Sequence, residues 1–96
     1  MKLEVITPEK KMFEGEVDAI RFPGIDGSFQ ILKNHAAIIS ALSAGKIKID
    51  LPNESQDFDA FSGEIENDPS SDKVVRLTIK GGVVECQNNH VIVLAD

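Results

Sequence analysis

Short runs of alternating apolar and polar residues, separated by turn-forming residues, occupy most of this sequence. Residues 46–51 (KIKIDL) alternate without exception, and residues 74–80 (VVRLTIK) follow the same pattern. Alternation with a period of two indicates strands with one face in a core and one face in water. The sequence has no heptads and no clear amphipathic helix. It therefore predicts an all-β fold, a flattened β-sandwich or barrel of about 8–10 short strands.

Four dipeptides mark the expected reversals of the chain. Pro fixes φ at the first central position of a type II turn, and Gly or Asn accepts the positive φ that tight turns require. The dipeptides are Pro23-Gly24, Asp26-Gly27, Gly81-Gly82 and Asn88-Asn89. We expect a type II turn at the first, a type I′ reversal at the second and tight hairpins at the other two.

Three segments depart from simple alternation. Residues 12–22 move their apolar side chains from one face to the other, as a β-bulge or sharp twist would, and Gly15 is the expected place of the bend. Residues 38–44 (IISALSA) fit either a strand or one turn of helix. Residues 90–95 (HVIVLA) are apolar on both faces, which predicts a strand covered on both sides.

Negative charge is concentrated in one stretch. The chain has 96 residues and a net charge of −6, and we expect a single domain over residues 1–96. Residues 50–73 hold eight of the sixteen acidic residues and one basic residue. Residues 52–73 are therefore interpreted as an acidic insertion. It is either a solvated segment that contains a short hairpin or helical turn, or a dedicated binding loop. In the second case the chain is a stand-alone β-sandwich module that binds a cation or a protein partner.

Composition argues against several classes of function. There is no basic stripe interleaved with aromatic residues, so we expect no binding to nucleic acid. The single cysteine, Cys86, excludes an internal disulfide and a cysteine-based zinc cluster, and it fits a reducing compartment. No window of 18 apolar residues exists, so any association with a membrane should be peripheral.

Side chains that could carry chemistry are few. The two histidines, His35 and His90, lack metal-ligand spacing. Glu14 and Glu16 share an outward strand face, where solvation is expected rather than acid–base chemistry. We expect no catalytic residue, no cofactor and no metal site. An assembly or coupling subunit and a ligand-binding module remain, ahead of an enzyme that would use His35.

Seven motifs follow one another in an order that resembles the ε subunit of bacterial F-type ATP synthases, which is called δ in mitochondria. They span nearly the whole chain and are interrupted only by residues 52–73. In order they are EVITPEK (4–10), FEGEV (13–17), PG with GSF (23–29), IL with HA (31–36), GKIKI (45–49), GGVVE (81–85) and VIVLAD (91–96).

The resemblance implies a rotor subunit that is not itself an enzyme. In this family an N-terminal β-sandwich at the foot of the central stalk binds the γ subunit and the ring of c subunits. It couples ion-driven rotation to ATP synthesis. The expected location is peripheral, on the cytoplasmic face of the bacterial inner membrane. A helical hairpin that regulates ATP hydrolysis would begin where this sequence stops, at Asp96, so we expect little or no autoinhibitory role.

The resemblance also implies two groups of contact residues. Those expected at the c ring are Asp26, Gly27, Ser28 and Phe29. Those expected at γ are His35, Ala36, Ala37 and Ile38. Ser28 stands where the family often has an acidic residue, and Ala37 stands where it usually has Pro. A permanently bound subunit should also expose a larger apolar patch than a free monomer does.

Overall fold

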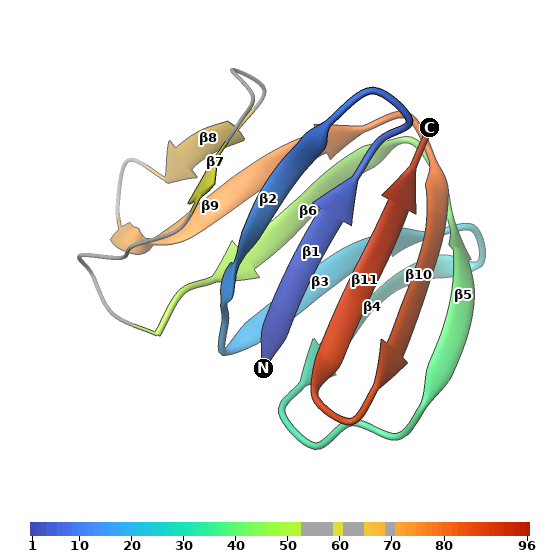
Figure 1. Cartoon of the computed structure of the whole chain (residues 1–96), viewed down its shortest axis with the longest axis horizontal. Helices are drawn as coiled ribbons and strands as arrows, with labels where there is room; N and C mark the ends of the chain where they lie inside the picture. Colours follow the sequence, from blue (N-terminus) through green and yellow to red (C-terminus); the bar gives the residue numbers. More distant parts are fainter. Residues whose placement is uncertain (53–58, 61–64, 69–70) are drawn as a thin grey trace.

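A computed structural model describes residues 1–52, 59–60, 65–68 and 71–96, which contain eleven strands and no helix (Figure 1). The all-β class is confirmed, and the strand count slightly exceeds the expected range because it includes the two-residue β7. The strands are β1 (Lys2–Ile6), β2 (Lys11–Glu16), β3 (Ala19–Gly24), β4 (Gly27–Leu32), β5 (Ile38–Leu42), β6 (Gly45–Asp50), β7 (Asp59–Ala60), β8 (Ile65–Asp68), β9 (Ser71–Ile79), β10 (Gly82–Gln87) and β11 (His90–Ala95).

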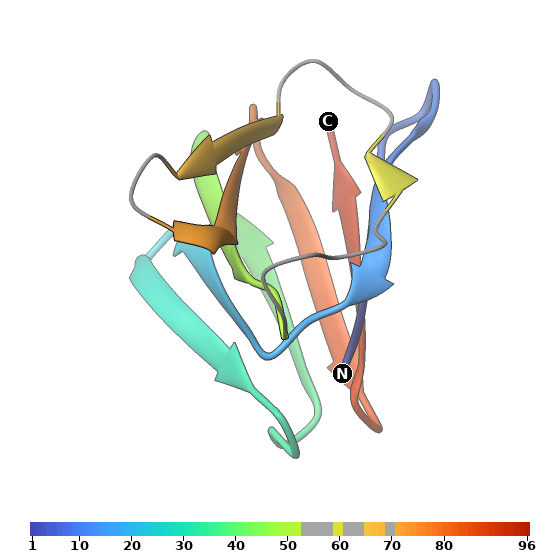
Figure 2. The same ribbon diagram turned by 90° about the vertical axis from the view of Figure 1, so that its left-hand side faces the viewer.

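One continuous sheet curls into two layers. The order β7-β2-β1-β11-β10-β5 makes the first layer, and β4-β3-β6-β9-β8 makes the second. The layers join at one corner, where Gly24 of β3 pairs with Leu42 of β5. Figure 2 shows the layers from the side, with β4 (cyan) and β11 (red) on opposite sides of the molecule. This arrangement is the flattened sandwich that the alternating runs predicted.

The core is made of apolar side chains from alternate positions of both layers. Ile47 and Ile49 in β6 are fully buried, as are Val91 and Val93 in β11. Phe22 is also fully buried, and its ring stacks on that of Phe29 with a centroid distance of 5.5 Å. Burial of one such side chain contributes about 1.5–3 kcal/mol. Within the described part of the chain, no polar or charged residue is fully buried.

The change of phase in residues 12–22 has two structural causes, and the predicted bend at Gly15 is wrong. Gly15 pairs with β1 in regular register. The register shifts at the start of β2 instead, where Met12 is the extra residue, so Met12 and Phe13 are both buried. β2 then ends, and β3 begins in the other layer.

The first predicted turn is displaced. β3 continues through Pro23-Gly24, so the type II turn expected there is wrong. The two loop residues are Ile25 and Asp26, because Gly24 pairs with Gly27, and neither loop residue has positive φ. The reversal is therefore not the type I′ turn expected at Asp26-Gly27. Gly24 is required for space, since a Cβ there would lie 2.9 Å from the Phe29 ring.

The two later turn signals have different outcomes. Asn88-Asn89 closes the hairpin between β10 and β11 as predicted, with φ of 53° and 60°. Gly81-Gly82 does not close a hairpin. β9 pairs with β6 and β8, whereas β10 pairs with β5 and β11, so the glycines carry the chain from one layer to the other. A Cβ on Gly82 would collide with the backbone oxygen of Leu94.

The two ambiguous segments are strands where the structure describes them. Residues 38–42 form β5 and pair with β10, so the alternative of a helical turn is wrong. In the acidic insertion, β7 pairs with β2, β8 pairs with β9, and β9 already begins at Ser71. Lys46 of β6 forms an ion pair with Glu66 of β8 at 3.2 Å. Of the eight acidic residues on which the hypothesis of a binding loop rests, three (Glu54, Asp57 and Glu64) lie outside the described residues.

Candidate functional site

The residues expected at the c ring form the tip of the β3–β4 hairpin. Asp26, Gly27 and Ser28 are exposed, and Ile25 beside them is 64% exposed. Phe29 is half-buried and packs against the core, where it stacks on Phe22. The six residue pairs between β3 and β4 support this tip, and its Ile25 N–H donates to the Ala41 carbonyl of β5 at 3.2 Å. The tip thus presents an apolar side chain and a carboxylate on a supported hairpin.

The residues expected at γ form the loop between β4 and β5 and the first residue of β5. His35, Ala36 and Ala37 are exposed, whereas Ile38 is half-buried and pairs with Cys86. The polar contacts of His35 are local: its N–H donates to the carbonyl of Leu32 at the end of β4 (3.1 Å), and Nδ1 lies 2.7 Å from the Ala36 carbonyl. This arrangement suits a surface contact rather than catalysis.

The structure does not bring the two groups together. They lie at opposite ends of β4, which runs from the hairpin tip to the β4–β5 loop (Figure 1). A strand of this length spans about 20 Å. Two separate contact sites, each available to a different partner, are therefore possible on this domain.

An exposed apolar face lies beside the second group, and sequence analysis did not name its residues. The side chains project outward from β5, β10 and β11, and three of them are well exposed: Ile39 (73%), Leu94 (58%) and Val83 (42%). Ile92, between them, is half-buried. Val83 pairs with Leu94 and lies diagonally opposite Ile39 and Ile92, whereas the exposed Glu85 stands between Ile39 and Ile92. Ile39, Val83, Ile92 and Leu94 are called the apolar face below.

The signal for the apolar face was present in residues 90–95, which were predicted to be covered on both sides. One side is confirmed, since Val91, Val93 and Ala95 are buried. The described residues leave the other side open at Leu94 and only partly cover Ile92. A strand that is apolar on both faces but covered on one suggests that a partner supplies the second cover.

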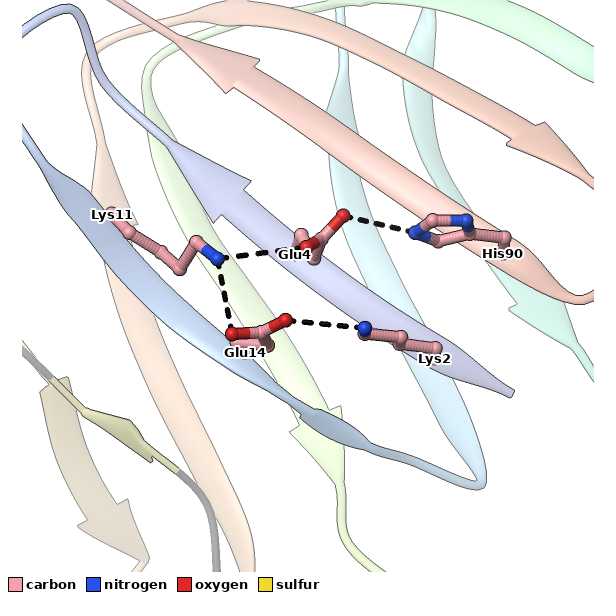
Figure 3. A network of polar contacts seen from close by, with 5 residues as sticks. All are labelled: Lys2, Glu4, Lys11, Glu14 and His90. Carbon is pink, nitrogen blue, oxygen red and sulfur yellow. Dashed lines mark hydrogen bonds and ion pairs between the residues drawn. The ribbon is translucent and has the colours of Figure 1, made fainter.

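A network of charged side chains occupies the other half of the same outer surface (Figure 3). Lys11 Nζ lies 3.0 Å from Glu14 Oε1 and 3.6 Å from Glu4 Oε1, and Lys2 Nζ lies 3.1 Å from Glu14 Oε2. His90 Nε2 lies 2.9 Å from Glu4 Oε2. The hydrogen bond from Lys11, followed by that from Lys2, lowers the pKa of Glu14 to about 2. The same bond to Glu14 raises the pKa of Lys11.

The described residues offer little else that could react. They contain no group of three or more His, Cys, Asp or Glu side chains placed to hold a metal ion. The Cys86 thiol is buried, and burial raises its pKa, which disfavours the nucleophilic thiolate. The described residues contain no helix with the length and apolar character needed to cross a membrane.

Comparisons with known proteins identify the family of this chain. The family described as "ATP synthase, Delta/Epsilon chain, beta-sandwich domain" matches residues 1–65. An ATP synthase epsilon chain from Chlorobium limicola is 35% identical over 95 residues, covering 99% of this chain and 88% of the relative. An epsilon chain from Leptospira interrogans serogroup Icterohaemorrhagiae serovar copenhageni is 32% identical over 96 residues, covering 100% of this chain and 61% of the relative.

A solved structure has a similar fold. It is a chain in the cryo-EM structure of the Tetrahymena thermophila mitochondrial ATP synthase central stalk and c ring, with a TM-score of 0.64 and 20% identity. The match covers 99% of this chain and 62% of that chain. At this identity the likeness concerns the fold, while the family match and the sequence relatives establish kinship. This chain belongs to the ATP synthase delta/epsilon family and carries its β-sandwich domain.

Proposed function

We propose that this chain is a non-catalytic subunit of the rotor of an F-type ATP synthase. It binds the γ subunit and the ring of c subunits and helps couple ion-driven rotation to ATP synthesis. It associates with the cytoplasmic face of the bacterial inner membrane through these partners. Family membership supports this proposal, as do relatives named ATP synthase epsilon chain and a fold neighbour from a central stalk and c-ring structure.

The γ contact consists of His35, Ala36, Ala37 and Ile38 together with the apolar face. The loop leads directly into β5, where Ile39 projects outward onto the apolar face and Ile38 packs against the core. Three well-exposed apolar side chains on one sheet face, at Ile39, Val83 and Leu94, are the observation that carries this proposal. Burying such side chains against γ supplies the driving force for association, part of which offsets the lost freedom of the two proteins.

The c-ring contact is the hairpin tip formed by Asp26, Gly27, Ser28 and Phe29. It lies at the end of β4 opposite to residues 35–37, and it adjoins the apolar face at one edge, because the Ile25 N–H donates to the Ala41 carbonyl (3.2 Å) and Ala41 pairs with Val83. Stacking of Phe29 on Phe22 ties the tip to the core. A tip that does not bend independently of the core can transmit force between the two contacts, because close-packed interiors deform little.

The test is a titration of this chain with the purified γ subunit from the same organism, followed by calorimetry. We expect Leu94→Lys to weaken binding at least tenfold, because it places a charge in the apolar contact. The control is Thr78→Lys, which adds the same charge at an exposed position of β9 in the other layer. If both variants bind γ as the parent chain does, the proposed γ contact is wrong.

A further inference from the structure

The loop between β4 and β5 is tied to the β10–β11 hairpin by two asparagines that lie 55 positions apart in the sequence. The backbone N–H of Asn34 donates to Asn89 Oδ1 at 2.6 Å, and Asn89 Nδ2 donates to Asn34 Oδ1 at 3.0 Å. Each side-chain amide thus fixes the orientation of the other. These reciprocal bonds between Asn34 and Asn89 are called the Asn clasp below.

The backbone at both positions restricts which residues can serve. Asn34 has φ of 67° and Asn89 has φ of 60°. Only glycine adopts this left-handed conformation freely, and asparagine tolerates it better than most other residues. Glycine would satisfy the backbone, but at position 89 it could form neither bond, and at position 34 it would keep only the bond from its own N–H. Asparagine meets both requirements, and it does so at both ends of the contact.

Between described residues, the other hydrogen bonds assigned to residues 33–37 are those of His35, which reach Leu32 at the end of β4 and the neighbouring Ala36. None of them reaches another strand, and regular pairing with β10 begins only at Ile38. Ala36 and Ala37 have no side chain long enough to anchor the segment. The Asn clasp is therefore the polar link that sets where this loop lies relative to the sheet.

We propose that Asn34 and Asn89 are positioning residues for the γ contact: the Asn clasp holds residues 35–37 in the conformation that binds. This inference rests on the proposed function, since it takes His35, Ala36 and Ala37 to be part of that contact. The β10–β11 hairpin thereby raises the affinity for γ without touching γ through Asn89. The reason is that a preordered loop loses less conformational freedom on binding than a free one.

The first test measures order in the loop. In Asn89→Gly the backbone keeps its conformational freedom, and only the side-chain bonds are lost. The control is Asn88→Gly in the same turn, where φ is 53° and the described residues provide no side-chain hydrogen bond. We expect solvent exchange of the Asn34 amide, followed by NMR, to accelerate about tenfold in Asn89→Gly and to change less than about twofold in Asn88→Gly. Equal exchange in the two variants overturns the Asn clasp.

A conservative variant separates positioning from general stability. Asn89→Asp keeps an acceptor for the Asn34 N–H but has no amide donor for Asn34 Oδ1. We expect its exchange rate to lie between those of the parent and Asn89→Gly, with melting temperatures that differ little among the three. If exchange follows the melting temperature instead, the Asn clasp is merely structural and the proposal fails.

The second test links the Asn clasp to γ. Asn89→Gly should weaken γ binding about fivefold, Asn88→Gly should not, and combining Asn34→Gly with Asn89→Gly should be no worse than Asn89→Gly alone. If exchange accelerates while γ affinity is unchanged, residues 35–37 are not part of the contact and the positioning role is overturned. The Leu94→Lys titration does not involve the loop. If Leu94→Lys binds γ as the parent chain does, the proposed γ contact fails, whatever the exchange rates of the Asn89 variants are.

Discussion

Glu4 of β1 and Glu14 of β2 lie directly opposite each other, and the Lys11 ammonium group binds both carboxylates. Like charges at opposed positions of neighbouring strands are destabilising. Lys11 sits beside the bulge at the start of β2, where the shifted register brings its ammonium between the two carboxylates. Lys2 and His90 complete the network from either end (Figure 3).

The network predicts a pH dependence of stability. The pKa of Glu14 is lowered from 4.5 to about 2. A lowered pKa in the folded state means that the unfolded chain binds a proton first as the pH falls. The contribution of Glu14 is therefore complete above about pH 4.5 and is lost as the pH falls towards about 2.

Glu14→Gln should remove this part of the dependence. We expect its urea midpoint to fall less than that of the parent chain between pH 5 and pH 3. Glu16→Gln is the control, because Glu16 is exposed and its one assigned ion pair joins its Oε2 to the N-terminal ammonium group of Met1 at 3.6 Å. Parallel pH profiles for the parent and Glu14→Gln would contradict the prediction.

The stacked pair of phenylalanines predicts a large effect in the core. Phe22 is fully buried, and its ring packs 5.5 Å from that of Phe29. Phe22→Ala should lower the free energy of unfolding by about 3–5 kcal/mol, because it removes a buried ring and leaves a cavity. Phe22→Leu, which keeps much of the volume, should cost clearly less. Urea denaturation measures both, and equal losses would show that the site collapses around the alanine.

Residues with a regular local pattern were predictable from the sequence. Ile47 and Ile49 are buried as their alternation indicated, and Asn88-Asn89 closes a hairpin. Gly81-Gly82 shows the limit of such reasoning. Two glycines indicate that the chain reverses or passes close to another backbone, but the partner strands of β9 and β10 depend on pairings far away in the sequence. A local signal cannot distinguish a hairpin from a passage between layers.

The candidate site shows the same limit more strongly. Positions 26–29 and 35–38 came from the resemblance, and their contacts stay proposals. For the apolar face, the sequence indicated only the apolar strand at residues 90–95. Its other members could not be predicted, because Ile39, Val83 and Leu94 come from three strands whose adjacency follows from register. The Asn clasp was invisible for the same reason, since Asn34 and Asn89 are 55 positions apart. Each feature combines residues that no short segment contains.

Two glycines with similar backbone angles should respond differently to substitution. Gly82 has φ of 146° and a Cβ there would lie 2.9 Å from Ala95 Cα, whereas Gly27 has φ of 122° with no atom within 4 Å of its Cβ position. Gly27→Ala should cost about 1–3 kcal/mol for backbone strain alone. Gly82→Ala should cost more, because β10 must also move away from β11. Thermal unfolding of the two variants checks this order, and the reverse order would contradict the structure.

Residues 26–29 and residues 35–37 lie at opposite ends of β4, so we expect different substitutions to weaken the c-ring contact and the γ contact. Ile25 is 64% exposed at the hairpin tip, and Leu94 is 58% exposed on the apolar face. Ile25→Lys should weaken binding of the γ–c-ring subcomplex relative to γ alone, while Leu94→Lys should weaken binding of γ itself about tenfold. Both side chains are exposed, so neither change should lower the melting temperature by more than a few degrees. Pull-down of this chain by purified γ and by the γ–c-ring subcomplex distinguishes the sites. If Ile25→Lys weakens binding to γ alone as strongly as Leu94→Lys does, the hairpin tip belongs to the γ contact, and the assignment of residues 26–29 to the c ring is wrong.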